Sequence, residues 1–527
     1  MSKDNTIKVA VIGSGLAGLS ASYFLSQGQV EGGDKHFQVH LFEKNSQLGM
    51  DAASISVGPE KDFRIDVPMR SFMSGYYSHL SNLYKHLEIP AKEAKFSFGW
   101  YRILQLAKKK QVDIQASEVA SYTDNNSYLV YSGARTVGHL DMVKSSTSST
   151  VLDYIADICR FFWRAFIVAF SYVSIMVISL WLHRRGHLKD PQHPICNTTL
   201  GSFFKSYRFH PYFVHEIFVP LFAAVCTNSY QSMLNYPASD ILEYMAVGLF
   251  QESYVVACGV QHVVQTMSAP LKHVHLDTQI ITIQPNKNPS YRFEIIDEHH
   301  NKYDFNHIVF ATQGNQAIKM LQSYASILNQ QQSSTYEHYK ENLEIVHRQI
   351  EMLKKFRYDT ALVINHTDTR LLPSNPSNWK ALNLAMLDES VDPGNSDLII
   401  PYPHDTTMTT HILNMTHSNL IEKSSIYMQT TNPCLAVDPK KVLSVSWFER
   451  ATVTLESKKA LQQELFQPQK ENHEPVLGPC QGKNSIWFVG SYCWKGIPLL
   501  EGCVASAEFV VTKGIASAEN IDIKLPY

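Results

Sequence analysis

Hydrophobic residues near the start of the chain form two short runs separated by a segment of small residues. The first run, residues 8–12, reads Lys-Val-Ala-Val-Ile and predicts a buried β-strand. A glycine-rich turn at residues 13–18 follows it, and the small-residue segment at 19–26 predicts a helix. The second run, residues 37–42, predicts another strand that ends directly before Glu43. The pattern therefore predicts a strand–turn–helix–strand unit.

The turn at residues 13–18 has the spacing of a dinucleotide-binding motif. It reads Gly13, Ser14, Gly15, Leu16, Ala17 and Gly18, which fits G-x-G-x-x-G between a strand and a helix. Gly13 permits the tight turn, Gly15 lets the backbone approach a pyrophosphate, and Gly18 lets the helix pack close to the strand. The first N–H groups of the helix then face the phosphates, and Glu43 can accept hydrogen bonds from ribose hydroxyls. We therefore expect a dinucleotide here; the alternative is an ordinary glycine-rich βα turn.

Later segments predict that this nucleotide-binding domain is interrupted by an insertion. A β-rich block at 274–312 resembles the domain resumed, and a buried strand at 485–490 ends in glycine. A mostly helical stretch at 76–250 and short strands from 358 to about 451 lie between these pieces. We therefore predict an α/β fold in which a discontinuous Rossmann-like cofactor domain carries an inserted α+β substrate domain. The cofactor domain is assigned to residues 1–75, 251–335 and 470–515, and the inserted domain to residues 76–250 and 336–469.

The end of the chain has features of a second cofactor contact. After the strand at 485–490, Glu501 and Gly502 precede an apolar helix at 503–511. Reduced flavin carries negative charge near N1 and O2, and a helix N-terminus at that place stabilises it. A strand and helix that only pack together are the alternative. The flavin hypothesis requires the two ends of the chain to meet in one fold.

An apolar segment at 165–182 contains 18 residues without a charge. As a helix it is about 27 Å long, close to the hydrocarbon thickness of a bilayer. Trp163 and Trp181 lie near its ends, where interfacial aromatic residues are expected. The basic residues that flank the segment are Arg160, Arg164, Arg184 and Arg185. We expect residues 161–182 to associate with a membrane, by crossing it, dipping into one face or lying along it; the alternative is a fully buried core helix.

Composition narrows the classes of partner. Lys plus Arg number 46 and Asp plus Glu number 48, a net charge of -2, so nothing favours nucleic acid as a partner. The eight cysteines include no C-x-x-C pair and the 23 histidines no H-E-x-x-H spacing, so we expect reduced thiols and no metal site. Residues 1–6 are polar and have no apolar signal region. These features predict an intracellular protein, with or without membrane association.

The two ends together resemble the flavin-containing amine oxidase superfamily, whose FAD domain is of the glutathione-reductase type. The chain is most similar to a subgroup of FAD-binding, amine-oxidase-like proteins that also occurs fused to plant cyclopropane-fatty-acid synthases. The stretches that carry this closer resemblance are residues 199–213 with Val219-Pro220, residues 308–312, residues 366–373 with Trp379, and residues 486–508.

The resemblance implies FAD as the cofactor. It places the glycines of the turn on the pyrophosphate, Glu43 on the adenosine ribose and the backbone of Ile280 at the adenine. The implied cofactor contacts are Gly13, Ser14, Gly15, Leu16, Ala17, Gly18, Glu43, Lys44, Arg70, Ile280, Gly490, Glu501, Gly502 and Cys503. Two positions depart from the superfamily: Met50 stands where a second glycine is usual, and Ser491 where an acid is usual. Both departures weaken contacts to the flavin but leave the phosphate turn intact.

The resemblance also implies hydride transfer from a CH–CH or CH–NH bond of a small-molecule substrate to flavin N5. If residues 161–182 meet a bilayer, an apolar, lipid-like substrate is favoured over a soluble amine. Asp368 and Arg370 are predicted to form a structural ion pair, Arg70 is either a flavin or substrate contact or an exposed salt-bridge partner, and Cys493 is predicted to be a free thiol. No catalytic base is assigned; the lysines considered are Lys354, Lys355 and Lys380.

Two other functions remain open. The first is a flavoprotein that binds FAD for structure or sensing at a membrane surface and has no turnover. The second is an NAD(P)-binding protein, which the flavin-type segment at the C-terminus disfavours.

Overall fold

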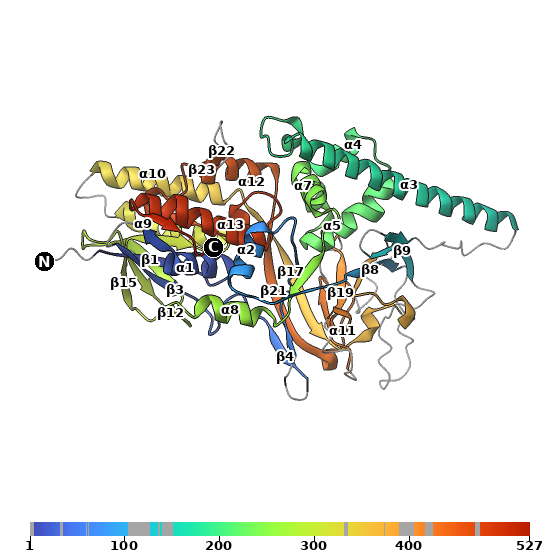
Figure 1. The fold of residues 1–527 in the computed structure, drawn as a ribbon, viewed down its shortest axis with the longest axis horizontal. Coiled ribbons are helices and arrows are strands. Elements are labelled where there is room, and N and C mark those ends of the chain that lie inside the picture. The colour runs from blue at the N-terminus through green and yellow to red at the C-terminus, as the bar shows by residue number, and fades with distance from the viewer. Residues whose placement is uncertain are drawn as a thin grey trace. The chain divides into compact units, whose positions relative to one another are not determined.

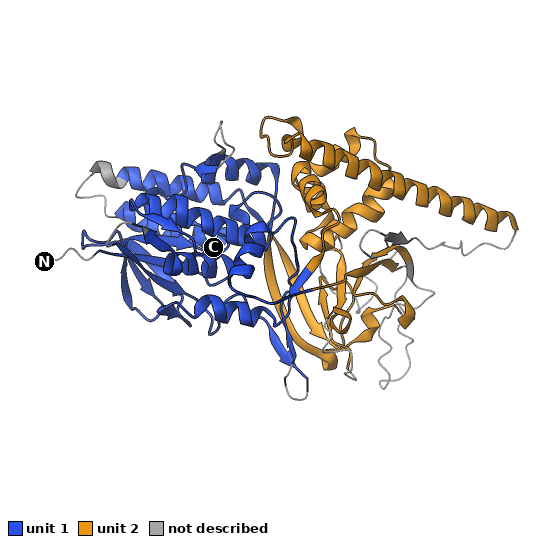
Figure 2. Ribbon diagram, viewed as in Figure 1, with its two compact units in different colours: residues 1–92, 254–357, 451–527 blue, residues 93–253, 358–450 orange. Residues whose placement is uncertain are grey.

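The chain folds into two compact units, each assembled from segments far apart in the sequence (Figure 2). Unit 1 comprises residues 1–92, 254–357 and 451–527, and unit 2 comprises residues 93–253 and 358–450. The computed structural model describes residues 5–31, 35–58, 61, 63–103, 127–134, 137–139, 151–330, 336–373, 375–388, 405–416, 425–468 and 475–527.

A five-stranded parallel sheet forms the centre of unit 1 (Figure 1). In spatial order its strands are β12 (His273–His275), β3 (His36–Phe42), β1 (Thr6–Ile12), β16 (His307–Phe310) and β24 (Ile486–Phe488). Val9 of β1 pairs with Val39 on one side and with His307 on the other. Ile308 of β16 pairs with Ile486 of β24. The first and the last strand of this sheet in the sequence therefore flank the same strand, which confirms that the two ends of the chain meet.

Helices rich in small and apolar residues pack on this sheet. The helices of unit 1 are α1 (Leu16–Gln27), α2 (Ser78–His86), α8 (Val260–Ser268), α9 (Gly314–Gln330), α10 (Tyr336–Leu353), α12 (Leu455–Ala460) and α13 (Leu500–Phe509), with π-helical turns at Leu461–Leu465 and Val510–Ala516 and 3-10 turns at Lys483–Ser485 and Ser491–Cys493. Every residue of α1 from Leu16 to Leu25 is buried. Side chains of α1 and α13 belong to one apolar core with the sheet, so the first and the last long helices pack side by side.

Small sheets complete unit 1. They are the antiparallel β13 (Ile280–Pro285), β14 (Phe293–Asp297) and β15 (Lys302–Phe305); β2 (Gln29–Glu31) with β25 (Asp522–Lys524); β4 (Ile55–Val57) with β5 (Phe63–Ile65); β22 (Phe466–Pro468) with β23 (Pro475–Leu477); and β6 (Phe72–Met73), β11 (Ser253–Val256) and β7 (Ala91–Glu93). Val30 of β2 pairs with Ile523 of β25. Lys35 donates to the carbonyl of Glu519 at 2.7 Å. The polar insert after α1 is therefore fastened to the last residues of the chain.

Unit 2 combines an eight-stranded sheet with a group of helices. In spatial order the strands are β10 (Val137–His139), β9 (Ser127–Ala134), β8 (Ser97–Ile103), β18 (Leu382–Leu387), β19 (Met408–Ile412), β20 (Met428–Thr431), β17 (Arg357–His366) and β21 (Val442–Thr452). The helices are α3 (Val151–Arg184), α4 (Leu200–Ser206), a π-helix (Tyr212–Phe218), α5 (Val219–Cys226), α6 (Tyr230–Leu234), α7 (Ala238–Gly248) and α11 (Leu413–Thr416), with 3-10 turns at Pro194–Asn197, Thr369–Leu371, Pro376–Asn378 and Pro439–Lys441. β8 and β18 pair in parallel.

The stretch predicted to be mostly helical, 76–250, differs from the structure in its first half. Strands β7 to β10 lie there, and the long helices begin only at Val151. β8 is buried over its last five residues without alternation. A continuous apolar run of this kind does not distinguish a buried strand from a helix by its period. The linker expected at residues 145–150 lies outside the described residues.

The unit boundaries also differ from those drawn on the sequence. Helix α10 and residues 451–468 belong to unit 1 and not to the inserted unit. The side-chain amide of Gln349 in α10 donates a hydrogen bond to the carbonyl of Cys480 at 3.0 Å. Arg348 pairs with Glu464 at 2.9 Å. These contacts fasten both segments to the part of the chain that carries β24.

Candidate functional site

The glycine-rich turn after β1 leaves open space beside Gly15. A Cβ atom on Gly18 would lie 1.9 Å from the carbonyl oxygen of Gly13, and one on Gly13 would lie 3.0 Å from that of Ala311, so both glycines are required for packing. Among the described residues no heavy atom beyond its chain neighbours lies within 4 Å of a Cβ built on Gly15. Gly15 is also the N-cap of α1. Because glycine has no side chain, the N-cap makes no side-chain hydrogen bond to the first N–H groups of the helix, including that of Leu16. An anionic group fits this space.

Glu43, the predicted ribose acid, holds the turn together. Its side chain is buried at the end of β3. One carboxylate oxygen accepts from the backbone N–H and the hydroxyl of Ser14, at 3.2 and 2.5 Å. The other accepts from the backbone and side-chain N–H groups of Asn45, at 3.0 and 2.7 Å. These four donors occupy all acceptor positions of a carboxylate, so a ribose hydroxyl binds Glu43 only if the Ser14 or Asn45 side chain rotates away.

The departure from the superfamily after Gly49 has a structural role. Gly49 donates to the hydroxyl of Ser14 at 2.6 Å, and a Cβ on Gly49 would lie 3.2 Å from the backbone nitrogen of Gly15. Asp51 is buried and pairs with Arg64 of β5 at 2.6 Å. The ion pair of Asp51 and Arg64 thus helps to fix the segment that follows Glu43.

The C-terminal loop reaches the glycine-rich turn through the loop after β16. Tyr492 donates its hydroxyl hydrogen to the carbonyl of Thr312 at 3.3 Å. A Cβ on Gly13 would lie 3.2 Å from the side-chain methyl of the same threonine. Gly490 donates to the hydroxyl of Ser506 in α13 at 3.0 Å, which fixes the loop to the helix. Thr312 and Tyr492 escaped the sequence analysis because their contact joins residues 180 positions apart in the chain.

Glu501 lies at the start of α13, but its carboxylate binds the N-terminus of α2. It accepts from the hydroxyl of Ser78 at 3.1 Å and from the backbone N–H groups of His79 and Leu80, each at 3.0 Å. A buried negative charge at a helix N-terminus stabilises that helix. The side chain of Glu501 therefore has a structural role that the sequence did not suggest, and its role toward a cofactor stays a prediction. Next to it, a Cβ on Gly502 would lie 2.7 Å from the carbonyl of Ser491, so this glycine permits close packing.

The other predicted contacts lie near these segments. Lys44 is exposed directly after β3, and Cys503 is half-buried in α13. Ile280 is buried at the start of β13, two residues after Thr278, whose N–H donates to the carbonyl of Glu43 at 2.9 Å. The adenine position that the resemblance implies is thus adjacent in structure to the ribose acid.

Arg70 is half-buried beside Asp66. Both carboxylate oxygens of Asp66 accept from the backbone N–H of Val260 at 3.1 Å, at the N-terminus of α8. Burial raises the pKa of Asp66, although that hydrogen bond and the charge of Arg70 oppose the increase. The first N–H groups of α2 and α8 thus donate to the carboxylates of Glu501 and Asp66, whereas α1 has glycine as its N-cap and, within the described part of the chain, no carboxylate bound there.

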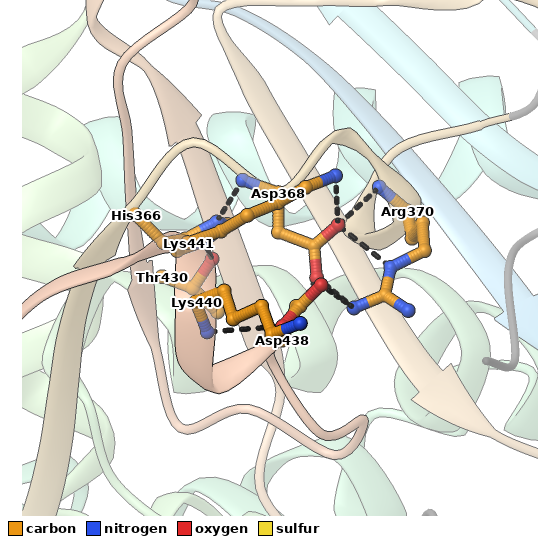
Figure 3. A network of polar contacts seen from close by, with 7 residues as sticks. All are labelled: His366, Asp368, Arg370, Thr430, Asp438, Lys440 and Lys441. Atoms are coloured by element: carbon orange, nitrogen blue, oxygen red, sulfur yellow. Dashed lines mark hydrogen bonds and ion pairs between the residues drawn. The ribbon is translucent and has the colours of Figure 1, made fainter. Parts of the chain in front are cut away.

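The predicted pair of Asp368 and Arg370 is confirmed (Figure 3). Asp368 accepts from Nε of Arg370 at 2.7 Å and from the backbone N–H of Asp438 at 2.9 Å. Burial alone raises the pKa of Asp368, but these hydrogen bonds lower it to about 2. His366 accepts from the backbone N–H of Asp368 at 3.0 Å, contacts Thr430 at 2.7 Å, and has its pKa lowered by burial to about 4. The network fixes the end of β17, and the charge of Asp368 is already paired within it.

Lys354 and Cys493, two further candidates for chemistry, have ordinary surroundings. Lys354 is half exposed and pairs with Glu351 at 2.6 Å within one turn of helix. Cys493 is buried, and burial raises the pKa of its thiol, which makes it a poor nucleophile. Neither side chain has the environment of a catalytic group.

The parallel sheet and its first turn define a Rossmann-like dinucleotide-binding domain, discontinuous in sequence and combined with a second unit. Residues 11–87 match the sequence family described as an NAD(P)-binding Rossmann-like domain. Comparison with curated protein sequences gives no significant match.

Three solved structures of oxidoreductases have the same overall fold as this chain. An oxidoreductase from Methanosarcina mazei is 12% identical, covers 96% of this chain and 99% of its own, and has a TM-score of 0.52. Putrescine oxidase bound to putrescine is 11% identical over 97% of this chain and 100% of its own, with a TM-score of 0.51. Cyclohexylamine oxidase from Brevibacterium oxydans is 10% identical over 98% of this chain and 99% of its own, with a TM-score of 0.50. These likenesses confirm the predicted fold class, a Rossmann-like α/β domain within an amine-oxidase-like architecture.

Proposed function

We propose that the chain is an FAD-dependent oxidoreductase of the amine oxidase type that oxidises a CH–CH or CH–NH bond of an apolar, lipid-like substrate. The observation that carries the proposal is the open space beside Gly15, because it lies at the turn where this fold binds a pyrophosphate. The loop after β16 links this turn to the segment after β24. A long dinucleotide that runs from one segment to the other is the ligand that suits both.

The residues present fit such a cofactor. The N–H groups of Gly15 and Leu16 at the start of α1 would donate to the pyrophosphate. Rotation of the Ser14 or Asn45 side chain would free Glu43 to accept from the adenosine ribose. The backbone after Gly490 would approach the other end. When bound, FAD supplies the hydride acceptor, and the protein supplies binding, orientation and exclusion of water. Among the described residues we assign none as the catalytic base.

The purified full chain tests this proposal directly. We expect a yellow preparation that absorbs near 450 nm, with FAD identified by mass spectrometry of the acid-released nucleotide. Under anaerobic conditions, mixing with a panel of long-chain amines and unsaturated or saturated acyl compounds should bleach this band for at least one class. A colourless preparation that binds NADPH or NADH, and does not bind FAD, would refute the proposal.

A non-catalytic flavoprotein is the second candidate. It is favoured by the position of Lys354, whose exposed ion pair with Glu351 gives it no role at a cofactor. In the same experiment, a bound flavin that bleaches with light and with none of the substrates supports this candidate.

A further inference from the structure

One face of α3 in unit 2 carries large apolar side chains that are exposed. Seven of them are more than half exposed, between 54% and 65%, and follow one another at intervals that keep them on one side of the helix. They are Phe162, Trp163, Phe166, Phe170, Val173, Val177 and Trp181, called here the α3 stripe. The stripe is about 28 Å long at 1.5 Å per residue. A continuous exposed apolar surface of this length indicates a contact with a partner or a membrane.

The opposite face of α3 is fastened to the rest of unit 2. Ile175 and Leu182 are buried on that face. Tyr172 packs its ring against Phe213 of the π-helix, with centroids 5.0 Å apart. His183 lies 2.8 Å from Glu243 of α7. The helix is long and apolar enough to cross a bilayer, yet only 33% of its most apolar window is buried. Helix α3 is therefore not a fully buried core helix. Lipid could not surround it either, because protein covers one of its sides.

Cationic and amphipathic side chains lie at both ends of the stripe. Trp163 and Trp181 are near the ends, and aromatic residues of this kind favour the interface between lipid headgroups and acyl chains. Arg160 is exposed at one end, and Arg184 and Arg185 are exposed at the other. A helix with an apolar stripe and basic ends matches an interfacial helix on an anionic membrane.

We propose that the α3 stripe docks on the surface of a bilayer containing anionic phospholipids, with α3 parallel to the membrane plane. The charges argue against a second copy of the chain as the occupant. In a parallel pair of stripes Arg184 and Arg185 of one copy would lie beside the same residues of the other. In an antiparallel pair they would lie beside Arg160, whose charge Asp157 of the same helix partly offsets at 2.8 Å. A membrane of anionic headgroups offers these arginines opposite charge. The proposal does not depend on the cofactor.

Vesicle flotation of the full chain tests the docking. We expect binding to phosphatidylcholine vesicles that contain 30% phosphatidylserine. Phe166→Asp together with Phe170→Asp should lower the partition coefficient at least roughly 100-fold, because two phenylalanines lose their burial in lipid. The matched control is Val445→Asp together with Trp447→Asp, which removes equally exposed apolar side chains from β21 and should leave binding unchanged.

The charge of the headgroups is tested separately. Arg184→Gln together with Arg185→Gln should lower partitioning to the anionic vesicles by roughly 30-fold and have a small effect on pure phosphatidylcholine vesicles. These arginines are exposed, so thermal unfolding of the variant should match that of the natural chain.

An exposed cysteine allows the docking of α3 to be probed. Cys159 is at the start of the α3 face, and Cys258 is in unit 1. With an environment-sensitive fluorophore on Cys159 and serine at Cys258, vesicles should shift the emission of the label to the blue. Absence of vesicle binding by the natural chain, equal loss with the β21 variant, or a dimer in sedimentation equilibrium that the Phe166 and Phe170 variant disrupts would each overturn the proposal.

Discussion

Replacing Gly15 with alanine should separate folding of the turn from binding of its ligand. Gly15 has φ -62 and ψ 176, a conformation open to any residue, and a Cβ there meets no described heavy atom within 4 Å. The effect of Gly15→Ala on the free energy of unfolding should therefore stay within about 1 kcal/mol. The added methyl group occupies the space proposed for the pyrophosphate. Each charge-assisted hydrogen bond lost to phosphate weakens binding by about 1.5–3 kcal/mol, so we expect FAD affinity to fall roughly ten- to hundredfold per bond.

Flavin content and thermal unfolding measured on the same preparations provide the assay. The contrasting variant is Gly18→Ala, because a Cβ there would lie 1.9 Å from the carbonyl oxygen of Gly13. Relief of that overlap requires the backbone to move, and we expect a loss of stability of about 1–3 kcal/mol or more. Gly15→Ala should thus give a folded chain without flavin, and Gly18→Ala a destabilised chain.

The reasoning is refuted if Gly15→Ala retains the natural flavin content and affinity. That result would place the cofactor away from the N-terminus of α1. Destabilisation equal to that of Gly18→Ala would instead show that the space beside Gly15 is filled in the folded chain.

Three further predictions concern the charged groups. Glu501→Gln should lower stability by about 1–2 kcal/mol, measured by urea unfolding, because the carboxylate at the N-terminus of α2 is lost; loss of flavin with unchanged stability would instead make Glu501 a cofactor residue. Asp368→Asn should lower the free energy of unfolding by about 1–3 kcal/mol because the buried carboxylate loses its charge-assisted hydrogen bonds, while Arg370 keeps Asp438 at 3.8 Å; Lys354→Ala, which breaks an exposed pair, should cost under about 1 kcal/mol, and equal effects would contradict the burial argument. The hydrogen bond that His79 donates to the carboxylate of Glu508 raises the pKa of His79 above 6.5. This pair should therefore stabilise the fold fully below pH 6.5 and lose that contribution as the pH rises through the raised pKa. His79→Gln should flatten this part of the stability profile, and an unchanged profile would exclude His79 as its source.

The fold of unit 1 could be predicted from the sequence where the residues that contact one another are also close in the chain. β1, the turn and β3 are consecutive, and the structure starts β1 at Thr6 and ends β3 at Phe42, close to the predicted limits. Asp368 and Arg370 are two positions apart in the chain, and their ion pair was likewise predicted. In each case the residues that determine the structure are neighbours in the chain.

The site was less accessible because its contacts are distant in sequence. Glu501 is adjacent to a glycine at the start of a helix, which is typical of a flavin contact, yet the donors to its carboxylate are more than 400 residues earlier, at 78–80. Glu43 was identified from its place after a strand, but its four hydrogen bonds depend on how Ser14 and Asn45 come together. The sequence pattern identifies the type of residue that a site needs, but only the fold shows which hydrogen-bond donors bind its side chain.

The order of strands in the central sheet has a consequence for synthesis of the chain. β1 can pair with β3 as soon as both leave the ribosome, but its other neighbour, β16, follows about 300 residues later. At about 5–20 residues per second the open edge of β1 waits about 15–60 s for its partner. An unpaired apolar edge is a template for association with other chains. We therefore expect newly made chains to be prone to association until β16 has been made, and truncated chains that end before residue 307 to aggregate.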